Sequence, residues 1–199
     1  MNDRKGERYF LQCQVKSRQR VINHGEVFTA EREVKAMCDL VNSECVNIYS
    51  RFLEPACGEG NFLIEVLTRK LASITDNHEL NSIIALSSLY GIDILADNVE
   101  ICRERLFNVW HNFTRSDSVI NSAKFILSRN IVCGDTLSMK FKDGSPIIFP
   151  EWTFDGCKII RRDFYLAELI EDDANLSLSF ENQPVKEYQD FRNIAEGNF

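Results

Sequence analysis

The sequence has no long hydrophobic run, no CxxC cysteine pair and no surplus of positive charge. Its apolar runs are all shorter than a membrane span, and the first residues, MNDRKGERYF, are polar and unlike a signal peptide. We therefore expect a cytoplasmic protein that does not contact a membrane. The 199 residues, 44% hydrophobic and 27% charged, suffice for a single globular domain spanning 1–199 with a sizeable core.

The seven cysteines are an odd number and lack the spacing of a disulfide or zinc framework. Most of them lie among apolar residues, so we expect reduced core side chains and no metal site. Cys57 lies inside a glycine-rich segment without an evident base beside it in the sequence. We interpret it as a small loop residue and not as a nucleophile.

The net charge is −7, with 23 basic and 30 acidic residues. Phosphate contacts dominate nucleic-acid affinity, so a chain this acidic is expected to bind duplex DNA weakly by itself. A basic N-terminal segment, 1–20, suits either a phosphate backbone, an acidic partner or a solvated helix face. The acidic segment 168–199 fits a terminal helix, a partner-binding segment or a flexible tail.

The chain is organised around residues 51–63, RFLEPACGEGNFL. An apolar run ends at Glu54, two glycines follow at Gly58 and Gly60, and an amphipathic pattern begins at Phe62. This pattern predicts a strand, a glycine loop and a helix. Glycines without Cβ atoms let the backbone approach a ligand, and the N-terminus of the helix directs unpaired N–H groups toward the loop.

Two further apolar segments end at or beside carboxylates. Residues 90–93 end at Asp93, and residues 130–133 are followed by Gly134 and Asp135. The three segments predict a parallel α/β sheet with its acids along the carboxyl edge, where such sheets bind ligands. Taken singly, Asp93 and Asp135 are equally consistent with helix caps or turn residues.

The acids of this edge favour a cationic ligand. Glu54 would repel the pyrophosphate of a dinucleotide, and the third glycine of GxGxxG is missing. S-adenosylmethionine fits better, because carboxylates can serve its ammonium, its ribose diol and its adenine amine.

Helix starts are predicted at two further places. Thr29 is a plausible N-cap for a helix with apolar residues at Val34, Met37 and Cys38. Asp97 and Glu100 have the spacing of a capping box for a helix that runs to Phe113. A polar linker, 114–122, is predicted to lead into the third strand.

The strings EPACGEGNFL, GIDI and VCGDTL resemble the first three motifs of the class I methyltransferases, and within them the adenine-N6 DNA methyltransferases of restriction-modification systems. GEVFTA, residues 25–30, resembles the cofactor motif that precedes the glycine loop in that group. The resemblance implies a Rossmann-like parallel sheet, S-adenosylmethionine as cofactor, and DNA as a substrate that is bound together with a partner subunit.

The resemblance also implies a cofactor site, in which side chains and loop backbone hold successive parts of S-adenosylmethionine. From the methionine end to the adenine these are Thr29 at the carboxylate, Glu54 at the ammonium, the backbone of Ala56, Gly58 and Gly60 beside it, Phe28 packed on the cofactor, Asp93 at both ribose hydroxyls, Ile94 on the adenine ring and Asp135 at its amine. Without the resemblance, Phe28 would be a hydrophobic staple residue before the cap of a helix.

The chain departs from that family where catalysis should begin. The family carries Asp, Asn or Ser, then Pro-Pro and an aromatic residue, to hold a flipped-out base. The four prolines here, Pro55, Pro146, Pro150 and Pro184, are not adjacent, so no catalytic residue is assigned. Two functions remain: methyl transfer to adenine N6 with the base-handling half on another chain, or a cofactor-binding subunit that regulates or completes a restriction or anti-phage complex. Methylation of RNA or of a small molecule is a third option.

Residues 146–165 predict a β-hairpin added after the sheet. Segments 147–149 and 157–164 flank Asp155-Gly156, a signal for a type I′ turn. Trp152 with Arg161 and Arg162 would form a surface for a base or a phosphate. In the alternative, Trp152 packs on the sheet and the arginines lie on its solvent face.

Overall fold

The computed structural model describes residues 17, 20, 22, 29–169 and 185–197. Within them the chain is mixed α/β, and none of the helices is long and apolar enough to cross a membrane. In chain order the elements are α3 (Glu31–Leu40), α4 (Asn42–Val46), β1 (Phe52–Glu54), α5 (Asn61–Ala72), α6 (His78–Ser87), β2 (Leu89–Asp93), α7 (Ala96–Thr114), α8 (Ile120–Asn130), β3 (Ile131–Asp135), β4 (Lys140–Phe141), β5 (Ile148–Asp155), β6 (Lys158–Tyr165), the 3₁₀ helix η1 (Leu166–Leu169), β7 (Val185–Tyr188) and the 3₁₀ helix η4 (Phe191–Gly197).

The first sheet contains the three predicted strands. Strands β1, β2 and β3 are adjacent and parallel, with Glu54 opposite Gly91 and Asp93 opposite Cys133. Each strand ends at the predicted carboxylate, so the acids share one edge. The sheet is nevertheless not wholly parallel, because β4 pairs antiparallel with the end of β3.

The predicted hairpin is present, but it belongs to a separate sheet. Strands β5 and β6 pair antiparallel, and β7 from the acidic C-terminal segment pairs with β6. The type I′ prediction at the tip is wrong. Asp155 still pairs with Lys158, so the two central residues are Gly156 and Cys157, and of these only Gly156 has a positive φ, 56°.

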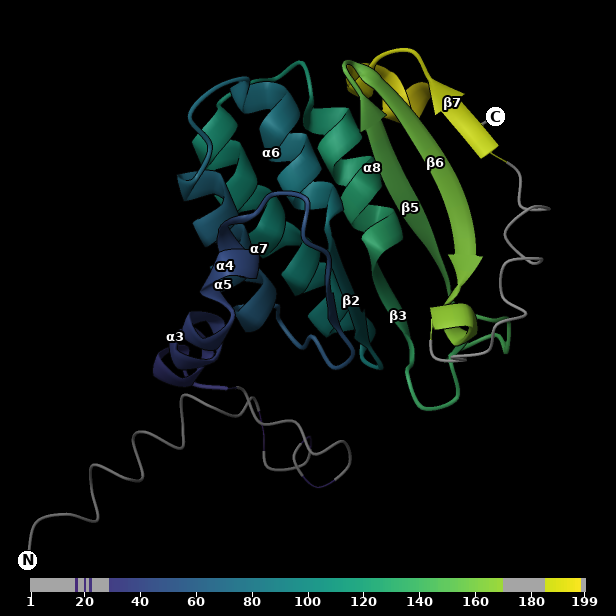
Figure 1. Ribbon diagram of the computed structural model, residues 1–199. Coiled ribbons are helices and arrows are strands. Elements are labelled where there is room, and N and C mark those ends of the chain that lie inside the picture. Colours follow the sequence, from purple (N-terminus) through teal and green to yellow (C-terminus); the bar gives the residue numbers. More distant parts are fainter. Residues whose placement is uncertain (1–16, 18–19, 21, 23–28, 170–184, 198–199) are drawn as a thin grey trace, which may run out of the picture.

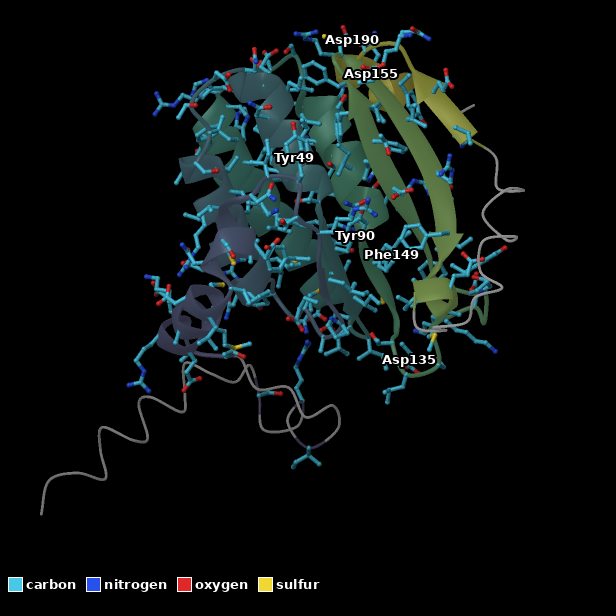
Figure 2. All side chains as sticks on the ribbon, in the orientation of Figure 1. Tyr49, Tyr90, Asp135, Phe149, Asp155 and Asp190 are labelled. Atoms are coloured by element: carbon cyan, nitrogen blue, oxygen red, sulfur yellow. The ribbon has the colours of Figure 1, made fainter. Side chains whose placement is uncertain are left out.

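The β5–β6–β7 sheet lies beside α8, on the side away from α3 to α7 (Figure 1). In that view α3 to α7 lie on one side, the β5–β6–β7 sheet lies on the other, and β2, β3 and α8 lie between them. Tyr90 and Phe149 meet edge to face across this boundary, with ring centroids 5.3 Å apart (Figure 2), and Tyr90 Oη donates to Pro150 O at 2.8 Å.

Asn130, at the end of α8, is a second polar link between the layers. Its Nδ2 donates to Ser87 O at 2.9 Å and to Leu89 O at 3.0 Å, and its Oδ1 accepts from Trp152 Nε1 at 2.9 Å. Trp152 is 7% exposed, and Arg161, 6% exposed, forms a bidentate pair with Asp163. Of the two interpretations of this hairpin, the surface for a base or a phosphate is wrong, because Trp152 packs in the core as the alternative expects. The alternative is wrong for Arg161, which is buried and does not lie on a solvent face.

Both predicted helix caps are wrong. Helix α3 begins at Glu31 with Ala30 as its N-cap, and α7 begins at Ala96 with Leu95 as its N-cap; neither start has a side-chain cap. Asp97 lies in the first turn of α7 and pairs with Arg20 at 2.7 Å. Helix α8 was not predicted: it begins at Ile120, within the expected polar linker 114–122, and runs to the start of β3.

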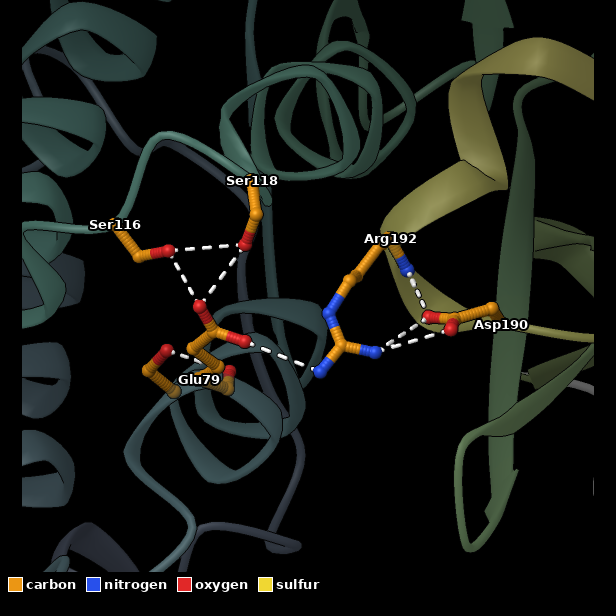
Figure 3. A network of polar contacts seen from close by, with 6 residues as sticks. Glu79, Ser116, Ser118, Asp190 and Arg192 are labelled. Atoms are coloured by element: carbon orange, nitrogen blue, oxygen red, sulfur yellow. Dashed lines mark hydrogen bonds and ion pairs between the residues drawn. The ribbon is translucent and has the colours of Figure 1, made fainter.

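The described part of the acidic C-terminal segment is packed against the domain. Phe191 is 2% exposed and Ile194 is completely buried. Glu79 of α6 accepts hydrogen bonds from Ser116 and Ser118 and pairs with Arg192 of η4 at 3.3 Å, while Arg192 also contacts Asp190 (Figure 3). Residues 185–197 thus complete the second sheet and tie it to the helical layer.

Candidate functional site

A cleft of about 670 Å³ lies at the carboxyl ends of β1, β2 and β3. It is formed by the loops that follow these strands and by the starts of α3, α5 and α7. Most of the predicted cofactor residues line it: Thr29, Glu54, Ala56, Gly58, Asp93, Ile94 and Asp135. Gly60 is not part of the lining, and Phe28 lies outside the described residues.

The glycine loop is held against β2 by its own backbone. Cys57 N donates to Ile92 O at 2.8 Å, and Gly60 N donates to Cys57 O at 2.8 Å. Gly60 is the N-cap of α5 with φ 84°, and a Cβ there would lie 2.6 Å from Cys102 Sγ of α7. Gly60 is therefore required for the turn and for the close approach of α7.

Asp93 is fixed at the centre of the cleft by three donors. Gly58 N donates to its Oδ2 at 2.9 Å, Leu95 N donates to its Oδ1 at 2.9 Å, and Asn98 Nδ2 donates to the same Oδ1 at 3.3 Å. Asp93 thus caps both loops, as the turn interpretation expects. Each carboxylate oxygen has two lone pairs, so Oδ2 retains capacity for one ligand hydroxyl.

Asp135 caps the turn that follows β3. Its Oδ2 accepts from Ser138 Oγ at 2.8 Å and its Oδ1 from Leu137 N at 3.0 Å. The Ser138 hydrogen bond, followed by that of Leu137, lowers the pKa of Asp135 below its ordinary value. Thr136 Oγ1 donates to Pro55 O at 2.6 Å and so joins this turn to the glycine loop.

The lining combines negative charge with exposed apolar side chains. Its carboxylates are Glu54, Glu59, Asp93 and Asp135, and none of the described lining residues is Lys, Arg or His. Ile94, 59% exposed, and Leu137, 94% exposed, flank the acids. Such a cleft suits a ligand that carries both positive charge and an apolar or aromatic part.

Two helix residues that support the cleft were not predicted. Arg105 of α7 donates from Nη1 to Glu59 O at 2.7 Å and to Asn61 Oδ1 at 2.8 Å, and Asn61 Nδ2 donates to Thr29 O at 3.2 Å. Asn98, 1% exposed, contacts Asp93 directly. In the sequence, both residues are polar positions in the helix that follows Asp93. The helical pattern alone does not show whether such a residue points toward the cleft or toward solvent.

Cys57 belongs to the glycine loop, and its side chain is almost fully buried. It is 6% exposed, and a hydrogen bond with Cys102, followed by burial, raises the pKa of its thiol far above the ordinary value. The thiol stays protonated, which agrees with its interpretation as a loop residue. Within the described residues, no group of three or more His, Cys, Asp and Glu side chains is arranged to hold a metal ion.

Comparisons with known proteins leave the family of the chain open. No family model matches it, and no curated protein and no solved structure matches it. The functional argument therefore depends on the geometry of the cleft.

Proposed function

We propose that the cleft binds S-adenosylmethionine and that the chain is a methyltransferase-like module with a Rossmann-like sheet. One observation carries the proposal: three strand-end carboxylates and a glycine loop line a single cleft of about 670 Å³. This volume falls within the range of cofactor sites, and the acids match the cationic groups of the ligand.

The residues present fit the parts of this cofactor. Asp93 Oδ2, with one donor from Gly58, can accept a ribose hydroxyl. Glu54 lies beside the glycine loop, where its carboxylate can hold an ammonium group. Ile94 offers an exposed aliphatic surface to the adenine ring, and Asp135, which also lines the cleft, can accept a hydrogen bond from the adenine amine. Once bound, S-adenosylmethionine would supply an electrophilic methyl group.

The same lining argues against nucleotides and dinucleotides. A phosphate group in the cleft would face Glu54, Glu59, Asp93 and Asp135 without a basic side chain from the described lining residues. Like charges that lie close together without a counter-charge repel one another, so the binding of a phosphate group here is unfavourable. The acidic lining is thus the feature that separates S-adenosylmethionine from ATP and NAD.

The methyl acceptor we propose is adenine N6 in DNA, with a partner subunit that supplies the base-handling groups. The second candidate is a subunit without transfer activity that regulates or completes a restriction or anti-phage complex. Two observations favour a partner in either case. The sequence has no adjacent prolines, and within the described residues no strand pairs with the outer edge of β1, beside the cleft.

Isothermal titration tests the cofactor. We expect S-adenosylmethionine and S-adenosylhomocysteine to bind with one site per chain, and ATP and NAD to give no heat under the same conditions. Absence of binding by both sulfur compounds would remove the proposal. Transfer of a labelled methyl group to DNA, measured with the chain alone and with candidate partner subunits, then separates the two functions: binding without transfer in every combination supports the second.

A further inference from the structure

Asn98 is a buried polar residue in the first turn of α7, and its amide group bridges two charged side chains. Its Nδ2 donates to Asp93 Oδ1 at 3.3 Å, and its Oδ1 accepts from Arg20 Nη2 at 3.1 Å. It is 1% exposed, so neither half of the amide is easily served by bulk water instead.

Arg20 connects the N-terminal region to this amide. Its Nη1 lies 2.7 Å from Asp97 Oδ2, and its Nη2 lies 3.3 Å from Asp97 Oδ1, so the guanidinium is held in a fork by the first turn of α7. An arginine can only donate. Nη2 therefore requires the oxygen of Asn98 to face it, which turns the Asn98 NH₂ group toward Asp93.

We propose that Arg20 and Asn98 are positioning residues for Asp93, so that Arg20, a side chain from before α3, helps to set the affinity of the cleft. This role rests on the proposed function, because Arg20 and Asn98 would adjust the affinity of the same cofactor site. Two donors, Leu95 N and Asn98 Nδ2, occupy Oδ1, which leaves Oδ2 to Gly58 and to the ligand. Loss of the Asn98 donor lets the carboxylate rotate away from the position that serves both.

Among the residues that the structure describes, charged and titratable groups near this carboxylate come from several segments of the chain. Arg20 is the positive group that contacts its neighbours directly, and the acids are those of the cleft and of the start of α7. They are Arg20, Glu54, Cys57, Glu59, Asp97 and Asp135. Removal of Arg20 removes a hydrogen-bond donor to Asn98 and also increases the negative charge around Asp93. The added negative charge favours a cationic ligand, so a loss of affinity in Arg20→Gln would come from the lost hydrogen bond and not from the charge.

A double-mutant cycle tests the proposal. Arg20→Gln and Asn98→Ala are each made alone and together with Asp93→Asn, and Arg32→Gln, an exposed cation on α3, is the matched control. We expect each single substitution to weaken S-adenosylmethionine binding about fivefold in titration calorimetry, and to have no further effect in the Asp93→Asn background. Effects that persist unchanged in that background would show that Arg20 and Asn98 act independently of Asp93.

Hydrogen exchange of the ligand-free protein provides a second measurement. The Gly58 and Leu95 amides donate to Asp93, so Asn98→Ala should speed their exchange, whereas the Cys57 amide, bonded to Ile92 O, should keep its rate. If Asn98→Ala speeds exchange at Gly58 and Leu95 but the wild type does not bind S-adenosylmethionine, the proposed cofactor is wrong and the positioning role of Asn98 stands. If the wild type binds S-adenosylmethionine and the variants show unchanged exchange and unchanged affinity, the positioning role is wrong and the proposed cofactor stands.

Discussion

At the scale of single residues, Asp93 shows how one side chain serves two purposes. The sequence presented it either as a turn acid or as a ligand acceptor, and the structure shows the first of these directly. Its carboxylate accepts from Gly58 N and Leu95 N and so holds the loops after β1 and β2 together. The same contacts hold Oδ2 in the cleft, where the proposed ribose hydroxyl would meet it.

Asp93→Ala should therefore affect both affinity and stability. We expect S-adenosylmethionine binding to weaken by roughly 2 kcal/mol, because the charge-assisted hydrogen bond from Oδ2 to the ligand is lost. The free energy of unfolding should fall by about 1–3 kcal/mol, since two loop amides lose their acceptor. Titration calorimetry and urea unfolding measure the two effects. An unchanged dissociation constant would show that the ligand does not contact this carboxylate.

Gly60→Ala should destabilise the protein more than Gly156→Ala. Both glycines have a positive φ, 84° and 56°, which costs an alanine about 1–2 kcal/mol. At Gly60 the added Cβ also meets Cys102 Sγ at 2.6 Å, whereas nothing lies within 4 Å of a Cβ at Gly156. Urea unfolding of the two variants separates the contact from the backbone strain. Equal losses would show that α7 moves away from the loop at little cost.

At the scale of elements, the sequence predicted those whose signal is local. An apolar run that ends in an acid was sufficient to predict β1, β2 and β3. Gly156 between two apolar segments was sufficient to predict the hairpin of β5 and β6. The predicted cap of α7 was wrong, because Asp97 lies in the first turn of the helix and forms a tertiary ion pair with Arg20. The burial of Trp152 depends on Asn130 of α8, a partner that no local pattern identifies.

Strand β1 depends on a buried lysine of α5. Lys70 Nζ donates to Asn47 O at 2.7 Å and to Ser50 O at 2.6 Å, and it lies 5.2 Å from the centre of the Phe52 ring. These contacts fix the turn that leads into the strand and hence the position of Glu54 at the cleft. Burial lowers the pKa of Lys70 to about 8.

The lowered pKa of Lys70 predicts a rise of stability with pH. Between about pH 8 and the ordinary lysine pKa of 10.5, the unfolded chain keeps a proton that the folded chain releases, so the free energy of unfolding increases with pH. Urea unfolding from pH 7 to 10 should show a steeper rise for the wild type than for Lys70→Met. Lys35→Met is the control: Glu31 raises the pKa of Lys35 above 10.5, so this lysine is protonated in both the folded and the unfolded chain below that pH, and its removal should leave the slope from pH 7 to 10 close to that of the wild type.

At the scale of the whole molecule, the C-terminal residues 185–197 hold the second sheet to the helical layer. Strand β7 pairs with β6, η4 packs its Phe191 and Ile194 into the core, and Arg192 reaches Glu79 at the start of α6. The acidic composition of this region could not predict such packing, because the apolar residues that enter the core are few and separated. The contacts to Ser116 and Ser118 join the linker between α7 and α8 to the same point (Figure 3).

The contacts of Glu79 with Ser116, Ser118 and Arg192, which we call the C-terminal anchor, predict a loss of stability in acid. Hydrogen bonds from Ser116 and Ser118, and then from Arg192, lower the pKa of Glu79 below its ordinary value of 4.5. A carboxyl group of lowered pKa contributes stability above pH 4.5, and this contribution disappears as the pH falls through the folded-state value. Urea unfolding from pH 6 to 3 should therefore show a shallower loss for Glu79→Gln than for the wild type.

Arg192→Met tests whether the anchor holds the C-terminal segment in place. Because the pair with Glu79 is partly exposed, we expect the free energy of unfolding to fall by only about 0.5 kcal/mol. Hydrogen exchange should be more sensitive, since the Phe191 amide donates to Cys157 O at 2.8 Å and would open with η4. Faster exchange at Phe191, with unchanged exchange at Ile92 in the first sheet, is the expected result. Equal acceleration at both amides would show that the two sheets unfold together and that Arg192 is no local anchor.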